Sequence, residues 1–216
     1  ARVWNDLGSY IASKDNQFCI NEVTGPDEYT ALVNNNYYTN AMAQLNLDYA
    51  YQVAQELQEN YSQQYQELKE KIDLTVEEVN AWQKAADNMY LPYDEELEIH
   101  KQDDSFLDKE VWDFENTPEE DYPLLLNYHP LVIYRYQVCK QADLVLALFL
   151  LGDKFSLEEK KRDFDYYEAV TTHDSSLSSC IHSIIAAEIG YHQQAYDYFM
   201  ETARMDLDNY HNNSQH

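Results

Sequence analysis

The chain has 216 residues and a formal net charge of −26, because 40 aspartate and glutamate residues outnumber 14 lysine and arginine residues. So acidic a surface repels nucleic acid and anionic membranes, and neither is expected as a partner. No apolar run is long enough to span a bilayer, and the first residues lack a signal-peptide pattern. The three cysteines have no metal-like or redox-like spacing, so we expect reduced thiols in a cytoplasmic protein.

The chain has few helix breakers, with 4 glycines and 5 prolines, and this favours an all-α fold. The periodicity predicts a first helix from Ala1 to about Ser13. No cap precedes this helix, which suggests a fragment cut from a longer protein. Phe18-Cys19-Ile20 is expected to form a short strand that leads into a turn at Gly25-Pro26.

Three helices are predicted next, over about 36–60, 61–72 and 75–89. Asn34 or Asn35 is expected to cap the first of them. Thr75-Val76-Glu77-Glu78 is a capping-box sequence for the third. Periodicity is then lost from about 90 to 128, apart from a short hairpin expected within 91–100. An irregular excursion of this length is usually functional or belongs to a larger whole.

A helix from Pro130 to Gly152 is predicted to be buried on every side, because Leu144 to Leu151 is apolar throughout. It would carry Arg135, Lys140 and Gln141 near its start. Three more helices are predicted over 157–170, 177–189 and 193–208. About eight antiparallel helices in one domain, residues 1–216, favour a helical-hairpin toroid or half of one.

Glu28 follows the Gly25-Pro26 turn and is flanked by Asp27 and Tyr29. Such a carboxyl group is a candidate general acid, kept protonated by partial burial beneath aromatic rings. The simpler interpretation is an acidic turn that suits the dipole of the following helix. The local sequence alone favours the simpler interpretation.

Lys140 and Gln141 interrupt an apolar stretch, and a buried cation and amide need partners. They would either hydrogen-bond sugar hydroxyls in a polar cavity or, for Lys140, pair with Asp143 or another carboxylate. Ser175 and Ser176 precede a predicted helix, whose free N–H groups favour an anion. Ordinary capping by Asp174 or Ser175 is the alternative. The histidines show no metal-ligand spacing, so neither a metal nor another cofactor is expected.

Taken together and in this order, these motifs resemble the catalytic domain of glycoside hydrolase family sixty-five, the maltose, trehalose and kojibiose phosphorylases. The matching segments are Gly25-Pro26-Asp27-Glu28-Tyr29, Val33-Asn34-Asn35-Asn36-Tyr37-Tyr38-Thr39-Asn40, Tyr134-Arg135-Tyr136-Gln137-Val138-Cys139-Lys140-Gln141-Ala142-Asp143, His173-Asp174-Ser175-Ser176-Leu177-Ser178 and Thr202-Ala203-Arg204-Met205-Asp206-Leu207-Asp208-Asn209-Tyr210.

The resemblance implies a six-hairpin α/α toroid of which this chain is the second part. It implies inverting phosphorolysis of an α-glucosidic bond, with disaccharide and inorganic phosphate as substrates and β-glucose 1-phosphate as product. Glu28 matches the general acid, and Lys140 and Gln141 match residues that hold the non-reducing glucose. Ser175 and Ser176 match the phosphate loop, and Arg135 is a further candidate contact for phosphate or sugar.

The family's full chain is several times longer, so the isolated piece is expected to be inactive. A histidine-containing segment of the family is expected just beyond His216. Exposed inner helices of a half-toroid favour a homo-oligomer. The alternatives are an α-glucoside hydrolase of the trehalase or glucoamylase type on the same toroid, which needs a water-activating carboxylate, and a non-catalytic helical interaction module.

Overall fold

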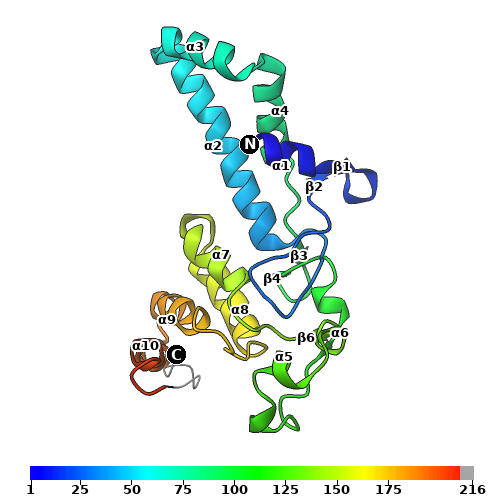
Figure 1. Ribbon diagram of the computed structural model, residues 1–216, viewed down its shortest axis with the longest axis vertical. Coiled ribbons are helices and arrows are strands. Elements are labelled where there is room, and N and C mark those ends of the chain that lie inside the picture. The colour runs from blue at the N-terminus through cyan, green and yellow to red at the C-terminus, as the bar shows by residue number, and fades with distance from the viewer. Residues whose placement is uncertain (210–216) are drawn as a thin grey trace.

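The computed structural model describes residues 1–209, and these form an elongated, helix-rich molecule (Figure 1). Ten α-helices and three two-stranded β-ladders occur in this range. The helices are α1 (Arg2–Leu7), α2 (Tyr37–Asn60), α3 (Ser62–Ile72), α4 (Val76–Asp87), α5 (Leu124–Asn127), α6 (Pro130–Ile133), α7 (Leu144–Leu150), α8 (Leu157–Glu168), α9 (Ser178–Glu188) and α10 (His192–Arg204).

The strands are short and lie outside the helical layers. Strands β1 (Ser9–Ile11) and β2 (Gln17–Cys19) pair antiparallel, as do β3 (Tyr93–Asp94) and β4 (Ile99–His100). Strands β5 (Glu110–Val111) and β6 (Tyr136–Gln137) pair in parallel. The strand at Phe18 and the hairpin within 91–100 are thus confirmed. The prediction of an all-α fold holds for the architecture, since the ladders only fasten loops.

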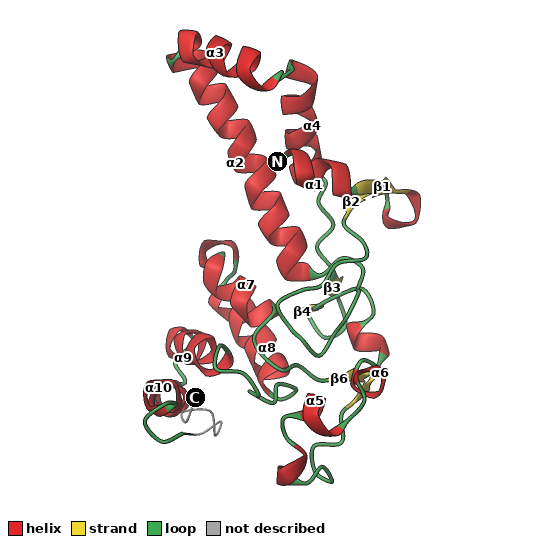
Figure 2. Cartoon of the chain, in the orientation of Figure 1, coloured by secondary structure: helices red, strands yellow, loops and turns green. Residues whose placement is uncertain are grey.

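The helices are arranged as antiparallel hairpins (Figure 1). Helix α2 packs against α4 and is joined to it by α3, α7 is followed by α8, and α9 packs against α10. Helix α7 also contacts both α2 and α9, so the three hairpins stand side by side. Figure 2 shows the loops gathered below the α2–α4 hairpin, near the first turns of α2 and α7. Within residues 1–209, no helix is both long and apolar enough to cross a membrane.

The N-cap of helix α2 lies one residue beyond Asn35, the later of the two predicted caps. Asn36 is the N-cap, and its side-chain oxygen accepts a hydrogen bond from Thr39 N at 2.9 Å. The prediction of Asn34 or Asn35 is therefore wrong. On the same helix Ala43 is fully buried, whereas the larger Leu45 is 41% exposed. Small alanines on α2 and α4 share one core cluster, which lets the two backbones approach closely.

The first helix is shorter than predicted. It ends at Leu7, and Ser9–Ile11 forms strand β1 rather than a further helical turn. A Cβ atom added at Gly8 would lie 2.2 Å from the Phe18 ring, so only glycine allows this close approach. Packing of Phe18 and pairing with β2 therefore outweigh the local helical pattern.

The single helix predicted over 130–152 is wrong. Helix α6 ends at Ile133, and α7 does not begin until Leu144. Between them the backbone bonds to distant segments, with Cys139 N donating to Val170 O at 2.8 Å. Arg135, Lys140 and Gln141 consequently lie on a turn and a loop, not on a buried helix.

Most other predicted elements are present with shifted ends. The helices predicted over 61–72, 75–89, 157–170, 177–189 and 193–208 correspond to α3, α4, α8, α9 and α10. Thr75 caps α4 by accepting from Glu78 N at 3.1 Å, and the Glu78 carboxylate bonds Arg2. The last residue of the tail motif, Tyr210, lies outside the described residues.

Candidate functional site

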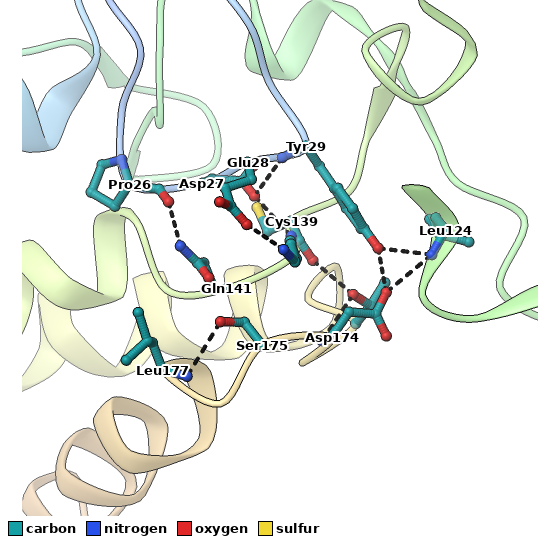
Figure 3. A network of polar contacts seen from close by, with 12 residues as sticks. Pro26, Asp27, Glu28, Tyr29, Leu124, Cys139, Gln141, Asp174, Ser175 and Leu177 are labelled. Atoms are coloured by element: carbon teal, nitrogen blue, oxygen red, sulfur yellow. Dashed lines mark hydrogen bonds and ion pairs between the residues drawn. The ribbon is translucent and has the colours of Figure 1, made fainter. Parts of the chain in front are cut away.

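Four segments from distant parts of the chain meet at the predicted site. They are the loop 25–29, the start of α2 at Asn36, the loop 139–143 and the loop 172–177 before α9. Figure 3 shows the three loops. Each comes directly before a helix or leads towards one. The antiparallel hairpins therefore bring the loops at one set of helix ends together, as the sequence predicts.

Asp27 is the centre of the hydrogen bonds at this site, and it is fully buried. Its Oδ1 atom accepts from Lys140 N at 2.8 Å and from Tyr29 N at 3.1 Å. Its Oδ2 atom accepts from Gln102 Nε2 at 3.1 Å. Because these donors come from three segments, the carboxylate holds the Glu28 loop against the Lys140 loop.

A second buried carboxyl group, that of Asp143, also contacts the loop 25–29. It accepts from Asp27 N at 3.2 Å and from Asn36 Nδ2 at 3.0 and 3.1 Å. A Cβ atom added at Gly25 would lie 2.4 Å from both Asn36 Nδ2 and Asp143 Oδ2. Gly25 is thus needed for close approach of the turn to the starts of α2 and α7.

The environment raises the pKa of both carboxyl groups. Burial, only partly offset by backbone N–H donors, raises the pKa of Asp27 to about 6. Burial and the nearby Asp27 carboxylate raise the pKa of Asp143 to about 8. Their pKa values in the unfolded chain are near the ordinary 3.8.

Two histidines beside the phosphate-loop candidate, the half-buried His173 and the buried His182, have lowered pKa values. Burial and the facing His182 ring lower the pKa of His173 to about 3, and burial lowers that of His182 to about 4. The rings meet edge to face with centroids 4.5 Å apart. His173 Nδ1 lies 2.8 Å from Ser178 Oγ, so the neutral ring anchors the start of α9.

These shifts predict that the chain loses stability between pH 6.5 and 8. Over that range folded Asp143 holds a proton that unfolded Asp143 has released, whereas unfolded His173 and His182, with an ordinary pKa of 6.5, lose the protons they still bind near pH 6.5 and so offset part of the loss. The free energy of unfolding should fall by about 1 kcal/mol in total, most of it above pH 7. Urea unfolding at a series of pH values measures this. Asp143→Asn is the matched control, and an equally steep slope in that variant would contradict the assignment.

Glu28 lies beside Asp27 but is far more accessible. Its side chain is 57% exposed, and its carboxylate pairs with the Lys140 ammonium group. The expectation that aromatic rings partly bury it is wrong. Tyr29, the neighbouring ring, is fully buried and points away towards Asp174 (Figure 3). The sequence predicted that Lys140, if it pairs within the protein, pairs with Asp143 or with another carboxylate. The structure shows the second case, because Lys140 pairs with Glu28.

Gln141 continues the loop that carries Lys140. Its side-chain Nε2 atom donates to Pro26 O at 2.6 Å, which ties the amide to the turn before Glu28. Only one of its two polar groups is used in this bond, so the side-chain oxygen stays available as an acceptor. Lys140, Gln141 and Glu28 are therefore adjacent, as expected for one site.

The loop before α9 lies across from Gln141 (Figure 3). Ser175 Oγ accepts from Leu177 N at 3.3 Å, and Ser176 is exposed. The Asp174 carboxylate instead accepts from Tyr29 Oη and, at 3.4 Å, from Leu124 N. Asp174 therefore does not cap α9, and neither hydroxyl is buried within the protein.

Arg135 lies on a different segment from the other candidates. Its side chain is exposed on the turn between α6 and β6. Within residues 1–209, none of its side-chain contacts joins it to Glu28, Lys140 or Ser175. No group of three or more histidine, cysteine and acidic side chains in the same range is arranged to hold a metal ion.

Sequence reasoning missed the supporting residues Asn36, Gln102 and Asp143. The signal for Asp143 was present, because a lone carboxylate between Ala142 and Leu144 in an apolar run needs buried partners. Gln102 has no such signal, since it lies in a polar loop. Only the fold places its amide beside Asp27.

A family model describes the whole chain. The model of the glycosyl hydrolase family 65 central catalytic domain matches residues 1–216. The chain is 59% identical over 213 residues to the α,α-trehalose phosphorylase of Thermoanaerobacter brockii, and this match covers 99% of the chain. It is 57% identical over 215 residues to the corresponding enzyme of Geobacillus stearothermophilus.

More distant relatives act on other disaccharides by name. The maltose phosphorylase of Bacillus subtilis is 36% identical over 215 residues, covering 100% of this chain. A solved structure, described as a candidate kojibiose phosphorylase from the human microbiome, superposes with a TM-score of 0.86 at 32% identity. That match covers 98% of this chain and 29% of the other. The chain spans 28% of each trehalose phosphorylase and 27% of the maltose phosphorylase.

Proposed function

The chain belongs to glycosyl hydrolase family 65, through that family's central catalytic domain, and on this premise we propose that it forms part of an inverting disaccharide phosphorylase. Two relatives above 50% identity are named trehalose phosphorylases, whereas the maltose phosphorylase is 36% identical. We therefore propose α,α-trehalose as the disaccharide. The rest of the site would come from the part of such an enzyme that lies outside this chain.

In the proposed reaction Glu28 donates its proton to the glycosidic oxygen as the bond to the anomeric carbon breaks. An oxygen of inorganic phosphate attacks the anomeric carbon from the opposite face and forms the new bond. The products are β-glucose 1-phosphate and free glucose. Because phosphate is the nucleophile, no second carboxylate is needed to activate water.

The observation that carries this proposal is the contrast between Glu28 and Asp27. Asp27 is fully buried and its oxygens are occupied, whereas Glu28, on the same fixed loop, presents its carboxylate to solvent. A rigid loop that exposes one carboxylate suits a general acid. Lys140 and the side-chain oxygen of Gln141 lie beside it and would hydrogen-bond the glucose hydroxyls.

Phosphate would bind at the loop before α9. The Ser175 and Ser176 hydroxyls precede an 11-residue helix, whose first N–H groups and dipole favour an anion. On a chain of net charge −26, long-range attraction for phosphate is absent, so such local donors are required. Arg135 is an exposed cation that would add a further contact for phosphate or sugar.

The test is turnover of the proposed full-length enzyme with and without inorganic phosphate. Trehalose, kojibiose, nigerose and maltose are offered separately, and glucose 1-phosphate and glucose are measured. Trehalose should be cleaved only when phosphate is present, and equal amounts of glucose 1-phosphate and glucose should appear. Phosphate-independent release of two glucose molecules would instead identify a hydrolase. Absence of any cleavage would support the non-catalytic interaction module.

A further inference from the structure

Glu28 and the Ser175-Ser176 loop are joined by a direct, partly buried contact between their immediate neighbours. Tyr29 follows Glu28, and Asp174 precedes Ser175. The Tyr29 hydroxyl donates to Asp174 Oδ2 and accepts from Leu124 N at 2.9 Å (Figure 3). One side chain thus spans from the general-acid candidate to the phosphate-loop candidate.

The Tyr29 end of this link is firmly held. Its ring is fully buried in a cluster with Trp112, Leu124, Ile133 and Val138. Its backbone N–H is fixed by Asp27 Oδ1 at 3.1 Å. Burial and the adjacent carboxylate raise the pKa of Tyr29 well above its ordinary value, so the hydroxyl keeps its proton and remains a donor.

The loop before α9 has a second, independent attachment, so losing the first need not unfold it. Thr172 N donates to Cys139 O at 2.8 Å, and Thr171 forms a parallel bridge with Cys139. Cys139 directly precedes Lys140. The loop is therefore tied at one point to the segment of Lys140 and at another to the segment of Glu28. Two attachment points define the position of a loop better than one.

We propose that Tyr29 and Asp174 are positioning residues whose hydrogen bond sets the distance from the general acid to the bound phosphate. This inference rests on the proposed function. In an inverting phosphorolysis the acid and the nucleophile act on opposite faces of the sugar, so their separation must match the width of the glucose ring. A displacement of about 1 Å at such a site can lower the rate about 100-fold.

The experiment uses Tyr29→Phe in the full-length enzyme. Phenylalanine keeps the buried ring, and Leu124 N still has the Asp174 carboxylate as an acceptor at 3.4 Å, so the variant should fold. The KM for phosphate should rise about 10-fold or more, because the loop is no longer fixed relative to Glu28. The KM for trehalose should stay within about twofold, since the contacts of Lys140 and Gln141 are intact.

Tyr128→Phe is the matched control. Tyr128 Oη donates to Asp121 Oδ2 at 2.6 Å, the same type of bond, and its ring packs against the same cluster. Its partner Asp121 lies outside the site, so neither KM should change. A structural role alone would instead give Tyr29→Phe and Tyr128→Phe the same kinetics, with effects only on thermal unfolding.

A pair of variants at Asp174 tests the other end. Asp174→Asn keeps a side-chain oxygen that accepts from Tyr29, whereas Asp174→Ala does not. The KM for phosphate should therefore rise less in Asp174→Asn than in Asp174→Ala. If Tyr29→Phe does not fold, the two Asp174 variants alone test the inference. An equal rise of the KM for phosphate in Asp174→Asn and Asp174→Ala would then overturn it.

The outcomes separate the inference from the function on which it rests. A wild-type enzyme without phosphate-dependent turnover contradicts the proposed function. If the wild-type enzyme requires phosphate but both KM values are unchanged in Tyr29→Phe, only the positioning role is overturned. Equal rises in both KM values would also overturn it, because they would indicate general loosening of the site.

Discussion

Replacing Glu28 by glutamine in the full-length enzyme should lower kcat for trehalose phosphorolysis by at least about 100-fold, because a positioned general acid contributes about 10² to 10⁴ to the rate. The KM for trehalose should change little, since the amide has the shape of the carboxyl group. Stability should change by no more than about 1 kcal/mol, the usual limit for an exposed ion pair. Initial rates of glucose 1-phosphate release measure the effect.

Two controls make this result specific. Glu22→Gln changes another exposed glutamate in the same region and should leave the rate unchanged. α-Glucosyl fluoride has a leaving group that needs no protonation, so Glu28→Gln should cleave it nearly as fast as the wild type does. A variant equally impaired with both substrates would contradict the role of Glu28 as an acid, and one that cleaves trehalose at the wild-type rate would favour a non-catalytic module.

The neighbouring substitution, Asp27→Ala, should destabilise the 216-residue chain by about 3 kcal/mol or more. It removes the acceptor of Lys140 N, Tyr29 N and Gln102 Nε2, three donors bonded at 2.8 to 3.1 Å. A buried donor left without an acceptor costs about 1 to 3 kcal/mol. That loss is a large share of the 5 to 15 kcal/mol that stabilises a typical domain.

Urea unfolding followed by circular dichroism measures the loss in Asp27→Ala. Glu28→Ala is the matched control, because it removes the same chemical group one residue further along the same loop. The control should lose no more than about 1 kcal/mol, since its side chain is 57% exposed. If the two substitutions cost the same, Asp27 does not hold the loops together as its contacts indicate.

The sequence by itself determined most of the helices and grouped three of the candidate site residues. Periodicity and caps located α2, α3, α4, α8, α9 and α10 because these helices depend on local spacing and local hydrogen bonds. The motif order was sufficient to group Glu28, Lys140 and Gln141 into one site, and the structure places them together. Their catalytic and binding roles remain predictions.

The tertiary structure alone decided the form of the loop from 134 to 143. The apolar run from Leu144 to Leu151 led to the prediction of one continuous helix that included this loop, yet Cys139 bonds Val170 and Lys140 bonds Asp27, partners that no local pattern reveals. It likewise placed Lys140 against Glu28 rather than Asp143, and it buried Tyr29 against Asp174 instead of over Glu28. A buried polar group takes whichever partner the packed fold brings within reach, and a sequence pattern records only neighbours a few residues away.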